Sequence, residues 1–201
     1  MKKIITADDF GYSKSVNLAI CRLLKKGLLS QASIMVNMPS FEHAVKLIKK
    51  YNLKNIGLHF NVTQGYSISN PSILFKKDIY NFPSVDFIKA EFEAQINLMK
   101  INNIDVHHID THHNSHLENS DILNVVNKYG IPVRSNMSKI LDTSSDISGI
   151  SNLCNELVDE FVVHPSISTN DLFDTVLLDS RINDYNFLNS NSDIIKQIIK
   201  I

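Results

Sequence analysis

The chain alternates short apolar runs with longer segments in which apolar residues recur every three or four positions. Short runs of this kind are typical of buried strands, and the three-to-four spacing is typical of amphipathic helices. The runs predict strands at residues 3–7, 32–36, 55–60, 106–109, 132–134 and 161–163. The spacing predicts helices at residues 15–26, 41–51, 85–101, 122–129 and 186–201.

Strands that alternate with helices predict a parallel sheet, because each parallel connection needs a crossover. The predicted strands are fewer than the eight of a closed β/α barrel. We therefore expect an α/β fold, an irregular or incomplete β/α (TIM-like) barrel rather than a doubly wound open sheet, in one domain spanning residues 1–201. Residues 63–83 are expected to form a long functional loop, and residues 135–151 carry little structural signal.

The composition is that of an ordinary globular protein, with 43% hydrophobic and 20% charged residues. The net charge of -1 and the pI near 6.7 argue against a surface for nucleic acids or anionic membranes.

The two cysteines, Cys21 and Cys154, make no disulfide framework and are expected in or near the core. The apolar start of the chain is too short for a signal peptide and no run has transmembrane length, so a cytoplasmic protein is expected.

Five of the eight histidines lie within ten residues, at positions 107, 108, 112, 113 and 116. Imidazole is the commonest protein metal ligand and titrates near neutral pH, so the cluster indicates metal or proton chemistry. His108, Asp110 and His112 alternate and would share one face of an extended strand. No cysteine joins the cluster, which argues against a zinc finger or an iron–sulfur centre.

Two adjacent carboxylates follow the first predicted strand, in the segment Ala7-Asp8-Asp9-Phe10-Gly11. Neighbouring strand residues point to opposite faces, so both carboxylates reach one site only if the strand bends, which Gly11 permits. One carboxylate could then bind a cation while the other stays free to take a proton. The alternative, which this segment favours when taken alone, is a solvated acidic turn.

Three further polar residues lie at or just past the ends of predicted strands: His59, Arg134 and His164. In barrels and open α/β folds the active site gathers at the carboxyl ends of the strands, so a shared metal site of carboxylates and imidazoles is expected there. Taken alone, His59 is more typical of a hydrogen-bonded core histidine. His164 could donate a proton to a leaving group or be structural, and Arg134 could orient a carboxylate or form a surface salt bridge.

The motifs, in their order along the chain, resemble those of the YdjC/ChbG-type carbohydrate deacetylases. They are Ala-Asp-Asp-Phe-Gly (7–11), Gly-Leu-His-Phe (57–60), His-Ile-Asp-Thr-His-His (108–113) and Val-His-Pro (163–165). The similarity extends from about residue 3 to residue 199, with Arg181 before the expected last helix. The first three motifs are specific in order and spacing, whereas the His-Pro and Arg134 matches are weaker.

The resemblance implies a metal-dependent hydrolase that removes acetyl groups from N-acetylated sugars such as chitooligosaccharides. By position, it implies that Asp9, His59 and His112 bind one divalent metal ion. It also implies that Asp8 is the general base and that His164 is the general acid. The remaining candidates, for substrate contact or for support of the metal ligands, are His108, Asp110, His116 and Arg134.

The resemblance implies Mg²⁺ as the metal, although two imidazoles and a carboxylate suit Zn²⁺ or another transition ion. The expected partner is an N-acetylated oligosaccharide, with no nucleic acid and no membrane, and the family implies a homodimer.

Two rival functions stay open. A metal-dependent phosphoesterase of similar architecture would need a basic phosphate clamp, which the motifs lack. A non-catalytic sugar-binding protein would not need Asp8.

Overall fold

The computed structural model describes residues 3–76, 83–134, 138–154, 157–173 and 175–199. Within these residues the main sheet has six parallel strands: β1 (Ile4–Phe10), β2 (Gln31–Ile34), β3 (Ile56–Phe60), β6 (Ile109–Thr111), β7 (Lys139–Ile140) and β8 (Glu160–Val163). Their order is β6-β3-β2-β1-β8-β7, so β8 lies beside β1. This order follows the chain cyclically, as in a β/α barrel, whereas a doubly wound sheet reverses its order at a switch point.

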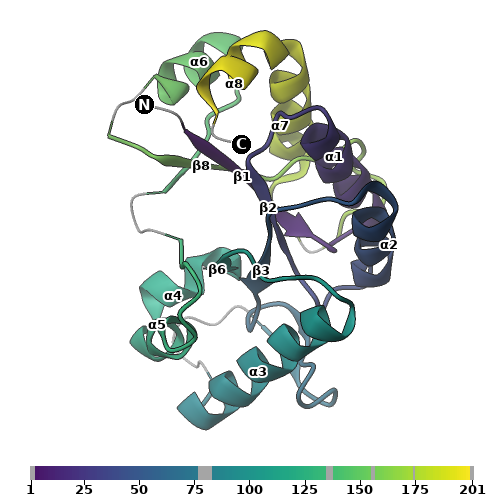
Figure 1. Ribbon diagram of the computed structural model, residues 1–201, viewed down its shortest axis with the longest axis vertical. Helices are drawn as coiled ribbons and strands as arrows, with labels where there is room; N and C mark the ends of the chain where they lie inside the picture. The colour runs from purple at the N-terminus through teal and green to yellow at the C-terminus, as the bar shows by residue number, and fades with distance from the viewer. Residues whose placement is uncertain (1–2, 77–82, 135–137, 155–156, 174, 200–201) are drawn as a thin grey trace.

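Figure 1 shows the strands in the middle of the molecule with helices around them. The sheet is curled, but its edge strands β6 and β7 are not paired with each other in the described part of the chain. The α/β class and the parallel sheet are therefore confirmed. The open, half-barrel sheet is compatible with the incomplete barrel expected from the sequence, and the single domain stays a prediction.

Four helices lie close to their predicted bounds: α1 (Lys14–Lys25), α2 (Phe41–Tyr51), α3 (Val85–Ile101) and α5 (Ser120–Asn127). Each buries an apolar stripe against the sheet or a neighbouring helix, as the spacing of its residues predicts. Ser13 and Ser84 cap α1 and α3 by accepting hydrogen bonds from backbone N–H groups of the first turns. The predicted helices were therefore most accurate where one face is apolar.

Alternate strand residues face opposite sides of the sheet, and the two sides differ in character. One side is apolar and belongs to the core beneath the helices, as Ile5, Ala7 and Leu58 do. The other side is polar although it is buried; it carries Thr6, Asp8, Gln31, Ser33, His59 and Asp110. A buried polar face needs internal hydrogen-bond partners, and these position the site described below.

The predicted final helix at residues 186–201 is wrong in its bounds. The structure has two helices there, α7 (Leu178–Ser190) and α8 (Ser192–Ile198), and Ile199 bridges Lys3 in parallel. The start of α7 shows no apolar stripe because its buried positions include Arg181 and Asp184. Arg181 thus lies within α7 and still precedes α8, the last helix of the described residues.

The strand predicted at residues 132–134 is also wrong, because only Val133 forms a bridge, to Ile109. Pro132 has no N–H to donate to a ladder. The strand predicted at 106–109 is shifted, since β6 covers Ile109–Thr111 and contains Asp110. The end of the histidine cluster forms two unpredicted short helices, η1 (His112–Asn114) and α4 (Ser115–Glu118).

The expected loop at residues 63–83 contains a small hairpin of β4 (Gly65–Tyr66) and β5 (Leu74–Phe75). Residues 77–82 of that loop lie outside the described residues. The segment 135–151, which had little structural signal, holds β7 and the start of α6 (Asp146–Leu153), and its residues 135–137 lie outside the described part.

Cys21 is buried as predicted, whereas Cys154 is exposed, contrary to prediction. In the described segments, no helix combines the length and apolar character needed to cross a membrane.

Candidate active site

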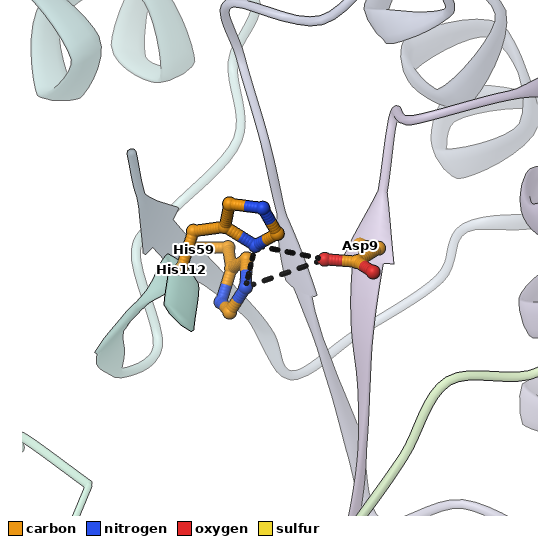
Figure 2. Close-up of side chains that lie close together, drawn as sticks. All are labelled: Asp9, His59 and His112. Atoms are coloured by element: carbon orange, nitrogen blue, oxygen red, sulfur yellow. Dashed lines mark hydrogen bonds and ion pairs between the residues drawn. The ribbon is translucent and has the colours of Figure 1, made fainter. Parts of the chain in front are cut away.

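Asp9, His59 and His112 converge from the ends of β1, β3 and β6, as Figure 2 shows. Nε2 of His59 lies 3.4 Å from Oδ1 of Asp9, and Nδ1 of His112 lies 3.3 Å from the same oxygen. The two imidazole nitrogens lie 3.2 Å apart. The structure therefore brings together the three residues that the resemblance to the family assigned to a metal.

The three donor atoms fit the coordination sphere of one divalent ion. Ligands about 2.1 Å from an ion lie about 3.0 Å apart in an octahedral sphere and about 3.4 Å apart in a tetrahedral one. All three observed separations, 3.2, 3.3 and 3.4 Å, fall in this range. Oδ1 of Asp9 is buried and has no hydrogen-bond partner among the described residues. An unpaired, buried carboxylate oxygen is costly unless a cation lies against it.

A bend in β1 brings Asp9 to the same side as Asp8. Asp9 has a φ of +67°, in the left-handed region, and the β1–β2 register shifts at this point as in a β-bulge. Gly11 follows with a φ of +99°, and a Cβ there would lie 2.6 Å from the carbonyl oxygen of Met35. The sequence predicted the bend at Gly11, and the structure adds a second, at Asp9 itself.

Both imidazoles are held in a ligating orientation by an oxygen behind them. Nδ1 of His59 donates to Oδ1 of Asp110 at 2.5 Å, which leaves Nε2 facing Asp9. Nε2 of His112 donates to Oε1 of Gln64 at 2.9 Å, which leaves the lone pair of Nδ1 facing the centre. Supporting oxygens of this kind fix the tautomer of metal-binding histidines.

Asp110 is itself fully buried and bonded on both oxygens. Its Oδ2 accepts from Oγ of Ser33 at 2.5 Å and lies 2.6 Å from Nη2 of Arg134. Nε2 of His108 lies 2.9 Å from the same Ser33 oxygen. The network holds Asp110 in place behind His59, so Asp110, His108 and Arg134 support the site rather than face it.

Asp8 lies beside the three converging residues and is held by Arg134. Nη1 and Nη2 of Arg134 donate to the two Asp8 oxygens at 2.8 and 2.6 Å. The same guanidinium contacts Asp110 and donates from Nε to Glu160 at 3.0 Å. One positive charge shared by three carboxylates leaves the group negative, so Arg134 orients Asp8 without neutralising it. Oδ2 of Asp8 lies 4.0 Å from Nε2 of His59.

His164 lies just beyond β8, with its Nε2 4.0 Å from Oδ2 of Asp8. Its backbone N–H donates to Asp184 of α7 at 2.7 Å, and Asp184 also accepts from Thr143. His116, another candidate, instead bonds Thr111 through Nδ1 at 2.6 Å and does not line the main cavity. The structure thus brings His164, but not His116, to the candidate site.

Four carboxylates, those of Asp8, Asp9, Asp110 and Glu160, pair with only two arginines, so carboxylates outnumber arginines at the site. Burial alone would raise the pKa of Asp9, but the Arg181 charge and the nearby imidazoles hold that pKa well below its usual range. Burial disfavours a charge on His59, yet Asp8 and Asp110 outweigh burial and raise the pKa of His59 to about 10. Burial lowers the pKa of His112, so this histidine is neutral at neutral pH, which is the ligating form. The same negative field favours a metal cation.

A cavity of about 850 Å³ opens above these residues. Asp8, Asp9, His59, His112 and His164 all lie in its wall. The β4–β5 hairpin forms another part of the wall, and exposed Ile140 and Val176 lie at its edge. The volume falls within the range typical of sites for small molecules.

A family model described as YdjC-like protein matches residues 2–157. The chain belongs to this family. The match confirms the resemblance seen in the sequence, and it contains Asp8 and the three converging residues Asp9, His59 and His112. His164 and helix α7 lie beyond the matched residues.

Curated relatives of this YdjC-like chain carry the name carbohydrate deacetylase. Carbohydrate deacetylase 2 of Listeria innocua is 34% identical over 157 residues, which cover 69% of this chain and 62% of the relative. The carbohydrate deacetylase of Brevibacillus brevis is 48% identical over 69 residues, which cover 34% of this chain and 28% of the relative. The chain therefore matches less than two thirds of the length of either relative.

A solved structure from Enterococcus faecalis V583, provisionally described as a cellobiose-phosphate cleavage protein, has a similar fold. The TM-score is 0.78, and the similarity covers 100% of this chain and 97% of that chain at 22% sequence identity. At this identity the similarity supports the fold of the YdjC-like chain alone.

Sequence reasoning assigned no role to three residues that lie at the candidate site of this YdjC-like chain, although it named Arg181 as part of the resemblance. Gln64 supports His112, Asp184 holds the backbone of His164, and Arg181 donates to Oδ2 of Asp9 at 2.6 Å. Gln64 lies in the expected functional loop, so its segment was identified but its role was not. Nothing in the apolar pattern marks Arg181 or Asp184, because both are charged residues on the buried side of a helix.

Gly57→Ala is expected to lower the free energy of unfolding by about 1–3 kcal/mol, as overpacking of a core does. A Cβ at this position would lie 2.5 Å from the His108 ring, which belongs to the network behind Asp110. Chemical denaturation of both proteins measures the loss. Because the clash involves only the ring, His108→Ala in the same chain should make the added methyl group tolerable. Equal stability of Gly57→Ala and the unmodified chain would contradict the close packing.

Proposed function

We propose that this chain is a metal-dependent hydrolase that removes acetyl groups from N-acetylated sugars such as chitooligosaccharides. The observation that supports it most is the convergence of Asp9, His59 and His112 beside Asp8 and His164 in the wall of one cavity. The family and the names of its curated relatives support the same activity.

Asp9, His59 and His112 would hold one divalent cation through Oδ1, Nε2 and Nδ1, respectively. When bound, such a cation lowers the pKa of a water molecule and polarises the carbonyl of an acetamide. The donor set of two nitrogens and one oxygen suits Zn²⁺, whereas the resemblance to the family implies Mg²⁺.

Asp8 would act as the general base. Its carboxylate lies beside the cation ligands without being one of them, and Arg134 fixes its plane through two hydrogen bonds. A carboxylate held in this way can take the proton of the attacking water. His164, on the other side of Asp8, would protonate the departing sugar amine.

The charges around the cavity favour a neutral sugar over a phosphate ester. Each of the two buried arginines near the site bonds a carboxylate, Arg134 that of Asp8 and Arg181 that of Asp9, although two of the Arg181 nitrogens have no partner among the described residues. Lys76 and Lys139 line the cavity but are exposed. A phosphoesterase would need such cations turned toward the substrate. A non-catalytic sugar-binding protein, in turn, would not need Asp8 to be buried and oriented.

Acetate release from N-acetylglucosamine oligomers, measured with and without added divalent metal, tests the proposal. We expect metal-dependent acetate release and no hydrolysis of aryl phosphates. Phosphate release without acetate release would favour the phosphoesterase instead. Sugar binding in the presence of metal without any turnover would favour the binding protein.

His164→Ala is expected to lower turnover of N-acetylated sugars much more than turnover of activated aryl acetates. An amine is a poor leaving group until it is protonated, whereas an activated phenolate departs unassisted. Steady-state kinetics on the two substrate types measure the difference. Equal losses of turnover on the two substrate types would show that His164 is not the general acid and would favour a structural role for it.

The substrate would lie in a groove bounded by the hairpin of residues 65–75, which lines the cavity. Chain length and sugar preference would depend on this wall. The homodimer and the cytoplasmic location expected from the sequence stay predictions.

A further inference from the structure

Arg181 reaches the candidate metal site from α7, outside the part of the chain that the family model matches. Its Nη2 donates to Oδ2 of Asp9 at 2.6 Å. The side chain is only 2% exposed, so water does not screen this pair from the rest of the site. Arg181 is therefore close enough, and buried enough, to affect the metal ligand directly.

The two oxygens of Asp9 are used differently. Oδ2 accepts from Arg181, while Oδ1 lies between the nitrogens of His59 and His112. A carboxylate can bind a cation with one oxygen or with both. As long as Arg181 holds Oδ2, Asp9 offers a cation only Oδ1, and the plane of the carboxylate is fixed.

Arg181 is held rigidly at both its backbone and its side chain. Its carbonyl oxygen accepts from the N–H of Ser166 at 3.0 Å, just beyond β8. One turn further along α7, Asp184 accepts from the N–H of His164. The guanidinium carbon lies 5.1 Å from the centre of the Tyr12 ring. These contacts dock α7 against the ends of β1 and β8, so Arg181 cannot follow Asp9 if the carboxylate turns.

The pairing of Arg181 is incomplete. Its Nε and Nη1 are buried and have no hydrogen-bond partner in the described part of the chain. A buried guanidinium with unpaired donors is a poor way to stabilise a fold, because it loses hydration without full compensation. The position therefore indicates a role in the site rather than in stability.

We propose that Arg181 is a positioning residue for the cation site. It holds Asp9 so that Oδ1 alone points at the gap between the two imidazoles. The inference rests on the proposed metal site and names a residue of this chain that tunes it.

Two effects of Arg181 on cation binding have opposite signs. As a positive charge near a cation, Arg181 repels it, and its removal would tighten binding. As a positioning group, it keeps the ligand oxygen in place, and its removal weakens binding. Loss of a residue that orients a metal ligand typically costs roughly 10–100-fold in metal affinity. We expect the positioning effect to dominate, because Arg181 is the partner that holds Oδ2, and without it Oδ1 would lose its fixed place between the two imidazoles.

Calorimetric titration with Co²⁺, together with the visible absorption of the bound ion, tests the proposal without any substrate. Arg181→Gln should bind Co²⁺ roughly 10–100-fold more weakly, because Asp9 is no longer held in its ligating position. It should also shift the absorption bands, because the second Asp9 oxygen becomes available to the ion. Arg181→Lys should recover part of the affinity, since an ammonium can still bond Oδ2. The matched control, Arg22→Gln on the exposed side of α1, should behave as the unmodified chain.

Unchanged affinity and unchanged bands in both Arg181 variants would overturn the inference and leave the proposed function intact. Tighter binding by Arg181→Gln would also overturn it, because repulsion would then be the larger effect. If Arg181→Gln does not fold, the lysine variant decides through the same two readouts. Failure of the unmodified chain to bind Co²⁺ would overturn the proposed metal site and this inference together.

Discussion

His112→Ala should leave the chain folded but abolish the proposed binding of a divalent ion, and the proposed metal-dependent acetate release should fall to the level of the metal-stripped protein. His112 supplies one of three converging donor atoms, 3.2 and 3.3 Å from the other two. Loss of a ligand should cost more metal affinity than the roughly 10–100-fold typical of a supporting residue. Calorimetric metal titration and circular dichroism of the same preparation measure the two effects.

His113→Ala is the matched control for this substitution. The His113 ring packs at a tilt against that of His112, with ring centres 3.9 Å apart, but His113 is not among the three residues whose donor atoms converge. It should keep the metal affinity of the unmodified chain. If His113→Ala loses as much metal affinity as His112→Ala, the assignment of His112 as the ligand is wrong.

Asp8→Asn should lower turnover by roughly 10²–10⁴-fold, the usual contribution of general acid–base catalysis, while metal affinity stays nearly unchanged. The amide keeps the shape of the carboxylate but cannot take a proton from water. Asp8 lies next to the proposed metal ligands and bonds Arg134, so Asp8→Asn should leave Oδ1 of Asp9 in place.

Asp9→Asn is the comparison that separates the two adjacent aspartates. It should weaken metal binding itself, because Asp9 supplies the only carboxylate oxygen of the three converging atoms. Metal titration and turnover of both variants, side by side, measure the division of roles. Equal loss of metal by Asp8→Asn and Asp9→Asn would contradict it.

The apolar runs predicted that carboxylates and imidazoles at strand ends would meet at one site, and the resemblance to the family selected Asp9, His59 and His112 among them. In a parallel sheet those strand ends share one edge, so local pattern and topology together place the side chains. Helices α1, α2 and α3 were predictable for a similarly local reason, an apolar stripe along one face.

Contacts between distant polar residues could not be predicted in the same way. Ser33 and Asp110 are 77 positions apart, and nothing in either segment indicates that they bond. Helix α7 was missed at its start because Arg181 and Asp184 occupy buried positions that the pattern expects to be apolar. The bend at Asp9 was only partly predicted, since a left-handed φ at an aspartate has no marker as clear as a glycine.

Add-back of metal to the stripped protein tests the central claim most directly. The chain is treated with a chelator and dialysed, and acetate release from N-acetylglucosamine oligomers is followed as Zn²⁺ or Mg²⁺ is titrated in. We predict negligible turnover in the stripped chain and recovery that saturates near one equivalent of a tightly bound ion. Full acetate release by the stripped chain, unchanged by added metal, would contradict the account.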